Sequence, residues 1–116
     1  MVITNAGTAG GDVKALVYVD AFIPEVGETV FQIVASQRPI TLGANTSPTE
    51  TAAWKTLPSL AVVGTEDRVI PPATQRSMAE RAGSTITEIA GSHVSMVSHP
   101  AAAIEAILAA VAAVDG

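Results

Sequence analysis

The segment from Leu60 to Pro72, LAVVGTEDRVIPP, constrains the fold of this chain more than any other. It opens on an apolar run of the kind that predicts a strand buried on both faces, as in a parallel sheet. The run ends at Gly64, and the segment closes on Pro71 and Pro72, which cannot continue a central strand. Asp67 lies between the run and the prolines. Open α/β sheets keep their functional groups at the carboxyl ends of the strands, so Asp67 is a candidate site residue.

A second predicted strand, residues 85–90, is followed directly by a Gly-Ser-His sequence that ends at His93. Because parallel strands end at the same edge of a sheet, we expect Asp67 and His93 to lie close together, where a carboxylate can orient and ionise an imidazole. Taken singly, Asp67 is more often a helix cap or a solvated loop residue, and a lone loop histidine is more often structural. The pair on neighbouring strand ends is the more specific signal, and it favours a catalytic role.

The remaining pattern predicts an α/β fold. Residues 13–21 (VKALVYVDA) predict a strand covered on both faces, and residues 71–82 predict a helix that stops at Gly83. After a loop at residues 94–100, Pro100 opens a final helix over residues 101–113, whose larger apolar side chains are spaced to bury one stripe: Ile104, Ile107, Leu108 and Val111. The order of strands and helices predicts helices linking parallel strands.

Residues 26–56 show the least regular pattern. Residues 28–35 are compatible with a short helix, and Ser47-Pro48-Thr49-Glu50 is typical of a helix start that would carry Trp54 over one or two turns. A stretch this long with little predicted structure usually covers a site or replaces something removed.

Composition and charge exclude several classes of function. The chain has 116 residues, enough for one domain, and 48 % of them are hydrophobic, so it is globular. A net charge of −5 argues against nucleic acid and against a polybasic membrane surface. There is no cysteine, which excludes thiol nucleophiles and disulfides and is compatible with the cytoplasm, where we expect the chain. We see no secretory signal and no stretch long enough to span a bilayer.

A metal site is conceivable from ligand types alone, since Asp20, Asp67, His93 and His99 are all metal-ligating residue types. No ligand-spacing motif supports it, so we expect no metal. Asp20, at the end of the first predicted strand, is either a carboxylate on the same rim or a turn residue. His99, directly before Pro100, is more simply a residue of the helix start.

The chain lacks the nucleophile that an Asp–His pair usually serves. A Ser-His-Asp device needs a serine on a tight strand-to-helix elbow, Gly-x-Ser-x-Gly, and no such motif occurs in this sequence. Ser92 adjoins His93 along the chain, where it cannot approach the imidazole in the usual geometry.

Three segments resemble the C-terminal half of an α/β-hydrolase, closest to the small esterases related to plant methyl-ester hydrolases and hydroxynitrile lyases. Residues 13–25 are similar to the strand and exit loop after the family's nucleophile helix, residues 60–72 to the strand bearing the triad acid, and residues 90–100 to the loop bearing the catalytic histidine. The resemblance implies Asp67 as triad acid and His93 as triad base. It also implies that the chain starts just after the nucleophile elbow and that residues 26–56 are a shortened cap.

These observations lead to one expectation with one alternative. We expect residues 1–116 to form a single truncated domain, a partial three-layer α/β-hydrolase-like fold with a small parallel sheet of about three strands. The resemblance implies hydrolysis of a small carboxylic ester without a cofactor, and we expect weak or no turnover by the chain alone. The alternative is a non-catalytic association module that pairs through the exposed strand 13–21 with a second copy or a complementary chain.

Overall fold

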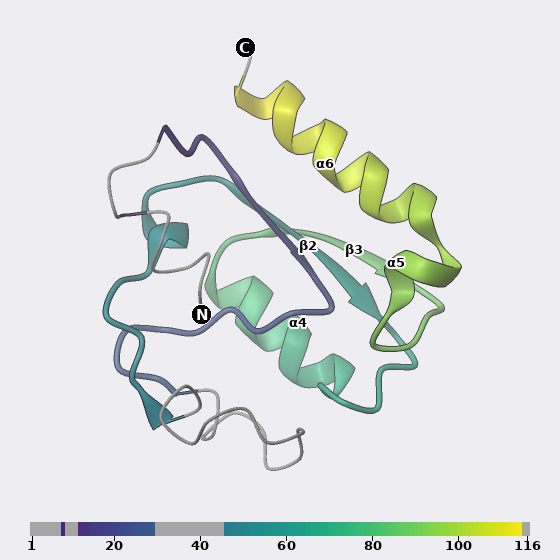
Figure 1. The fold of residues 1–116 in the computed structure, drawn as a ribbon, viewed down its shortest axis with the longest axis horizontal. Coiled ribbons are helices and arrows are strands. Elements are labelled where there is room, and N and C mark those ends of the chain that lie inside the picture. The colour runs from purple at the N-terminus through teal and green to yellow at the C-terminus, as the bar shows by residue number, and fades with distance from the viewer. Residues whose placement is uncertain (1–7, 9–11, 30–45, 115–116) are drawn as a thin grey trace.

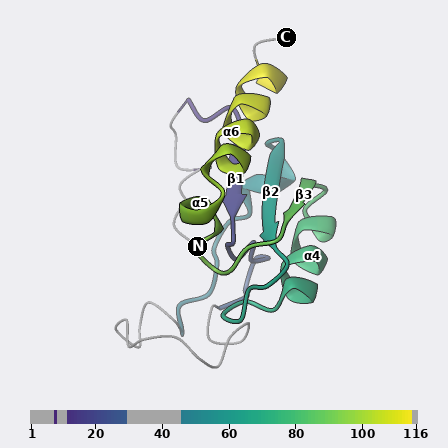
Figure 2. The same ribbon diagram turned by 90° about the vertical axis from the view of Figure 1, so that its right-hand side faces the viewer.

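The computed structural model describes residues 8, 12–29 and 46–114 of the 116-residue chain. In the described part of the chain (Figure 1), three parallel strands form the sheet, and Figure 2 shows them in the order β1-β2-β3. The elements in chain order are β1 (Leu16–Val19), the 3-10 turn η1 (Ala53–Lys55), β2 (Ser59–Gly64), α4 (Pro72–Arg81), β3 (Thr85–Ile89), α5 (Ser95–Ser98) and α6 (Pro100–Val114). This arrangement confirms the α/β class and the small parallel sheet expected from the sequence.

The central strand is β2, which pairs with β1 through Leu60 opposite Val17 and with β3 through Val62 opposite Thr87. Its apolar residues are buried on both faces, since Ala61, Val62 and Val63 are each at most 3 % exposed. The continuous apolar run therefore forms the doubly covered strand that it predicts.

Helices cover the two faces of this sheet in separate layers. Figure 2 shows α6 and α5 on one side of the strands and α4 on the other. Helix α4 starts where Pro71 and Pro72 stop the chain from remaining extended, and it packs Met78 and Ala79 inward. It ends before Gly83, whose φ of +65° is the left-handed conformation typical of a residue that follows a helix.

The packing face of α6 differs from the sequence prediction. Its buried residues are Ala106 and Ala110, and small side chains of this kind let a helix approach a sheet closely. The stripe that was predicted to be buried is instead about half exposed: Ile104 55 %, Ile107 52 %, Leu108 61 % and Val111 48 %. The prediction was wrong because two faces of α6 are apolar, and the spacing of large residues does not show which one meets the sheet.

Three further boundaries also differ. The first strand is shorter than residues 13–21, because Asp20 turns the backbone to a φ of +45°. No helix starts at Ser47: the backbone there is held by long-range bonds, from Gly27 N–H to Thr49 O (2.7 Å) and from Thr49 N–H to Glu28 O (2.8 Å). The predicted loop at 94–100 contains the short helix α5. Most of the predicted helix at 28–35 lies outside the described residues.

Two side chains hold the loop after β1 against the rest of the molecule. The indole Nε1 of Trp54 donates to Pro24 O at 2.9 Å. The Arg81 guanidinium, at the end of α4, donates to Ile23 O and to both carboxylate oxygens of Glu28. This loop is therefore fixed to the α4 side of the sheet. Among the described helices, none combines the length and the apolar character needed to cross a membrane.

The burial of β2 predicts how two equal deletions differ. Val62→Ala removes two methyl groups from a site that is 1 % exposed, whereas Val97→Ala removes them from a side chain that is 76 % exposed. We expect Val62→Ala to lower the free energy of unfolding by about 2 kcal/mol, through lost burial and a residual cavity. Val97→Ala should change it by less than about 0.5 kcal/mol. Urea denaturation measures both, and equal losses would contradict this account of the core.

Candidate active site

The carboxyl ends of β2 and β3 are joined by backbone contacts. Thr65 N–H, just after β2, donates to Ile89 O at 2.8 Å, and Glu66 N–H donates to Gly91 O at 3.0 Å. A Cβ on Gly64 would lie only 2.6 Å from Gly91 O, so the two loops approach more closely than any residue but glycine permits. The turn that carries Asp67 and the loop that carries His93 therefore lie against one another.

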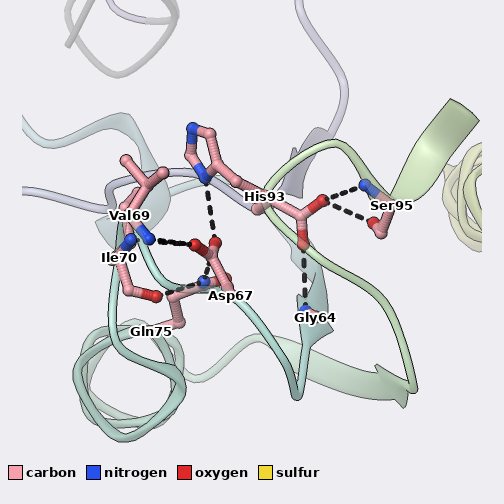
Figure 3. Close-up of polar contacts among 8 residues, drawn as sticks. Gly64, Asp67, Val69, Ile70, Gln75, His93 and Ser95 are labelled. Carbon is pink, nitrogen blue, oxygen red and sulfur yellow. Dashed lines mark hydrogen bonds and ion pairs between the residues drawn. The ribbon is translucent and has the colours of Figure 1, made fainter. Parts of the chain in front are cut away.

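The side chain of Asp67 is fully buried and accepts hydrogen bonds on both carboxylate oxygens (Figure 3). Its Oδ1 accepts from the backbone N–H groups of Val69 (2.7 Å) and Ile70 (2.9 Å). Its Oδ2 accepts from Gln75 Nε2 at 2.7 Å and lies 2.9 Å from His93 Nδ1. Four donors thus fix the position of the carboxylate before any ligand arrives.

His93 is held by one ring nitrogen and presents the other away from Asp67, as Figure 3 shows. Its side chain is 30 % exposed and lines an open depression of about 640 Å³. Because an ionised Asp67 can only accept, the proton of a neutral imidazole lies on Nδ1, which leaves Nε2 as an acceptor. The depression is lined by Thr65, Glu66, Asp67, Arg68, Val69, Ser92 and His93.

The electrostatic balance at Asp67 favours the carboxylate. Burial by itself would raise its pKa, but the hydrogen bond from His93, the backbone N–H groups of Ile70 and Val69, and the charge of His93 together outweigh burial. The net effect lowers the pKa of Asp67 below its usual value of 3.8. The group that faces His93 is therefore an anion at neutral pH.

The other candidates from the sequence do not join this pair. Asp20 lies in the turn after β1, at the same edge of the sheet, but it is buried, accepts from Gly64 N–H and Ser95 N–H, and does not line the depression beside His93. His99 is exposed, and its Nδ1 lies 2.9 Å from Ser98 Oγ. Within the described ranges, no three acidic or histidine side chains cluster closely enough to hold a metal ion.

No hydroxyl in the described part of the chain hydrogen-bonds to Nε2 of His93. Ser92 lines the same depression, but it precedes His93 directly. Ser95 is completely buried, and its hydroxyl donates to Asp20. The structure thus supplies an oriented imidazole without a serine partner among these residues.

Sequence reasoning missed Gln75, Ser95 and the two backbone donors to Asp67. Gln75 is 2 % exposed, and its amide bridges Asp67 Oδ2 and Ile70 O. Its position, one helical turn before Met78 on the buried face of α4, was the available signal. A polar residue on a buried helix face needs partners, and Asp67, in the turn before α4, was a candidate acceptor.

Comparison with known proteins agrees with this architecture. The sequence model of the alpha/beta hydrolase family matches residues 4–107, which is most of the chain. The chain belongs to the alpha/beta hydrolase family. A search of curated proteins gave no match. The resemblance seen in the sequence is thereby confirmed at the level of the family, and the catalytic roles of Asp67 and His93 stay predictions.

The lowered pKa of Asp67 predicts a specific acid dependence of stability. A depressed carboxyl pKa contributes stability that is present above the unfolded value and is lost as pH falls through the folded value. We therefore expect the free energy of unfolding to fall as the pH drops through and below the usual carboxyl value of 3.8, and to fall less steeply in Asp67→Asn. Denaturant titrations at several pH values measure these slopes.

Asp12→Asn is the matched control for this experiment, since the Asp12 side chain is 85 % exposed and pairs with Lys14 at the surface. It removes the same charge and should keep the parent slope. Parallel pH profiles for the parent and Asp67→Asn would contradict the account of the Asp67 contacts.

Proposed function

We propose that the depression beside His93 is the proton-transfer half of a carboxylic-ester hydrolase site, with Asp67 orienting the imidazole and no metal or cofactor taking part. One observation carries the proposal. His93 Nδ1 lies 2.9 Å from Asp67 Oδ2, while the second ring nitrogen points away from Asp67 and the ring lines the depression. This is the arrangement that lets an imidazole accept a proton from a nucleophile and later give it to a leaving group.

The chemistry follows from the charge of the pair. When Nε2 takes a proton from an attacking hydroxyl, His93 becomes an imidazolium, and the Asp67 carboxylate stabilises that charge at hydrogen-bond distance. Because Asp67 is already held by Val69, Ile70 and Gln75, it does not need to move as the charge develops. A small ester is the proposed substrate, since membership of the alpha/beta hydrolase family supports acyl transfer.

The nucleophile sets the expected rate. The sequence has no Gly-x-Ser-x-Gly motif, so no serine of an elbow of that kind faces His93 here. We propose that the chain by itself hydrolyses esters slowly, with His93 activating water, and that a full triad requires a serine from outside these residues.

A His93→Ala variant tests the proposal directly. We expect slow hydrolysis of p-nitrophenyl acetate by the parent chain and a fall of at least about tenfold in His93→Ala, because general-base catalysis contributes at least that much. The product p-nitrophenolate is followed by absorbance. His99→Ala is the matched control, since it removes the other imidazole, which is exposed and not in contact with Asp67. Equal rates in the parent and His93→Ala would remove the enzymatic interpretation.

The exposed face of α6 favours a second candidate function, association with another copy of the chain. Four large apolar side chains of α6 are about half exposed, although Ala106 and Ala110 already seat the helix on the sheet. Apolar side chains clustered on one exposed helix face are typical of interaction surfaces. Strand β1 lies at an edge of the described sheet, and α6 packs on one face of that sheet. We propose that two copies pair through this side of the molecule.

Leu108→Lys should weaken such pairing, because it places a charge among the exposed apolar residues of α6. Sedimentation velocity over a range of concentrations should show a dimer for the parent and a monomer for Leu108→Lys. Ala109→Lys adds the same charge at an exposed position of the same helix that lies away from the Ile104–Val111 stripe, and should remain a dimer. A folded monomer of the parent chain at all concentrations would contradict this second candidate.

A further inference from the structure

The structure assigns Asp20 as the positioning residue that holds His93 against Asp67. Asp20 lies at the end of β1, far from His93 along the chain, and its carboxylate contacts the residues on which the His93 loop depends. The inference rests on the proposed function only in treating His93 as the proton-transfer group. The placement of the imidazole can be measured without any activity.

The Asp20 carboxylate joins three segments of the fold. Its Oδ1 accepts from Gly64 N–H, at the end of β2, at 2.9 Å. Its Oδ2 accepts from Ser95 N–H at 2.9 Å and also from the Ser95 hydroxyl, at the start of α5. Asp20 is 4 % exposed and Ser95 is completely buried, so water does not compete for these bonds.

These contacts hold one end of the loop that carries His93. At the other end, Gly91 O accepts from Glu66 N–H at 3.0 Å, in the turn that also carries Asp67. The loop is folded tightly between these points, since a Cβ on Gly91 would lie 2.9 Å from Ser95 Cβ. His93 lies between two anchors, one on the Asp67 turn and one on Asp20.

Both anchors are needed because His93 itself has a single polar contact among the described residues. That contact joins its Nδ1 to Asp67 Oδ2 at 2.9 Å. If the Ser95 end of the loop were released, that one bond would have to hold a ring on a flexible segment, and the ring would leave Asp67 more often. Asp20 therefore acts on the imidazole through Ser95 and the backbone of the loop.

The backbone of Asp20 is consistent with a specialised role. Its φ of +45° makes it the one non-glycine residue with positive φ in the described part of the chain. This region is unfavourable for most side chains, and Asp and Asn enter it more readily than others. The conformation directs the carboxylate inward at the point where β1 ends. A strained residue with three buried donors is held there by the contacts that it makes.

Asp20→Asn is the sharpest test, because asparagine keeps the size of the side chain and tolerates a positive φ. It offers one acceptor oxygen, so Gly64 and Ser95 can no longer both be satisfied. We expect the Nδ1–H proton of His93, observed by NMR on ¹⁵N-labelled protein, to exchange with solvent at least about fivefold faster, the change expected for one lost hydrogen bond. His99 is the only other histidine, so a His99→Ala protein assigns the ring signals of His93 without ambiguity.

Asp12→Asn is the matched control, since it removes the same charge from a side chain that is 85 % exposed. It should leave the exchange of His93 Nδ1–H at the parent rate. An Asp20→Asn protein with a native amide spectrum and an unchanged exchange rate at His93 would overturn the assignment.

Ser95→Ala keeps the inference testable if Asp20→Asn does not fold. It removes only the hydroxyl bond to Asp20 and keeps the backbone bond. We expect about a twofold to fivefold faster exchange at His93 Nδ1–H, and a rate equal to the parent would likewise overturn the assignment. Neither exchange measurement needs turnover. A chain without esterase activity would therefore contradict the proposed function, while the exchange rates would still test the role of Asp20.

Discussion

The close approach of the β2 end to the loop after β3 is the constraint on which the rest of the site depends. At Gly64 an added Cβ would meet Gly91 O at 2.6 Å, Ser92 O at 2.9 Å and Asp20 Oδ1 at 3.0 Å. Backbone is thus packed against backbone at this point, and no side chain can separate the two loops. Parallel pairing of β2 with β3 brings the strand ends to one edge, and this contact reduces the remaining distance to a hydrogen bond between Asp67 and His93. Without this close approach of the two loops, Asp67 and His93 would lie at the same edge of the sheet but would not be in contact.

Two buried carboxylates at this edge have different tasks, and their surroundings explain the difference. Asp67 accepts hydrogen bonds from two backbone N–H groups of its own turn and from Gln75 of α4. It also contacts the imidazole of His93, which borders an open depression. Among the described residues, Asp20 accepts from Gly64 and Ser95, both inside the fold. A carboxylate that faces a titratable, partly exposed ring can influence proton transfer, whereas one that faces backbone N–H groups and a buried hydroxyl can only hold structure. The division of roles is therefore set by the neighbours and not by the residue type.

The sequence predicted most of the framework and one of the four polar contacts of Asp67, the one with His93. The apolar run of β2, the stop at Gly83 and the start of α6 at Pro100 are local signals, and each is found where the residues indicate. The meeting of Asp67 and His93 followed from strand topology. Local reasoning failed where two interpretations were equally compatible with the pattern. Both an alanine stripe and an isoleucine–leucine stripe run along α6, and only the space above the sheet decides that Ala106 and Ala110 lie inward. At Thr49 the backbone bonds to Gly27 and Glu28, a contact between distant residues that no helix-start motif could reveal.

The same distinction explains why Asp20 was ambiguous from the sequence. A carboxylate at a strand end suits either a rim or a turn, and the outcome depends on whether buried donors lie within reach. Here they do, because Gly64 has no side chain to keep Asp20 away and Ser95, at the start of α5, lies within hydrogen-bond distance of Asp20. The donors come from residues 44 and 75 positions away along the chain. An interaction of this kind is a property of the assembled sheet edge, so it becomes visible only when β1, β2 and the loop after β3 are seen together. The edge thus combines one carboxylate that orients the imidazole with another that fixes the loop carrying it.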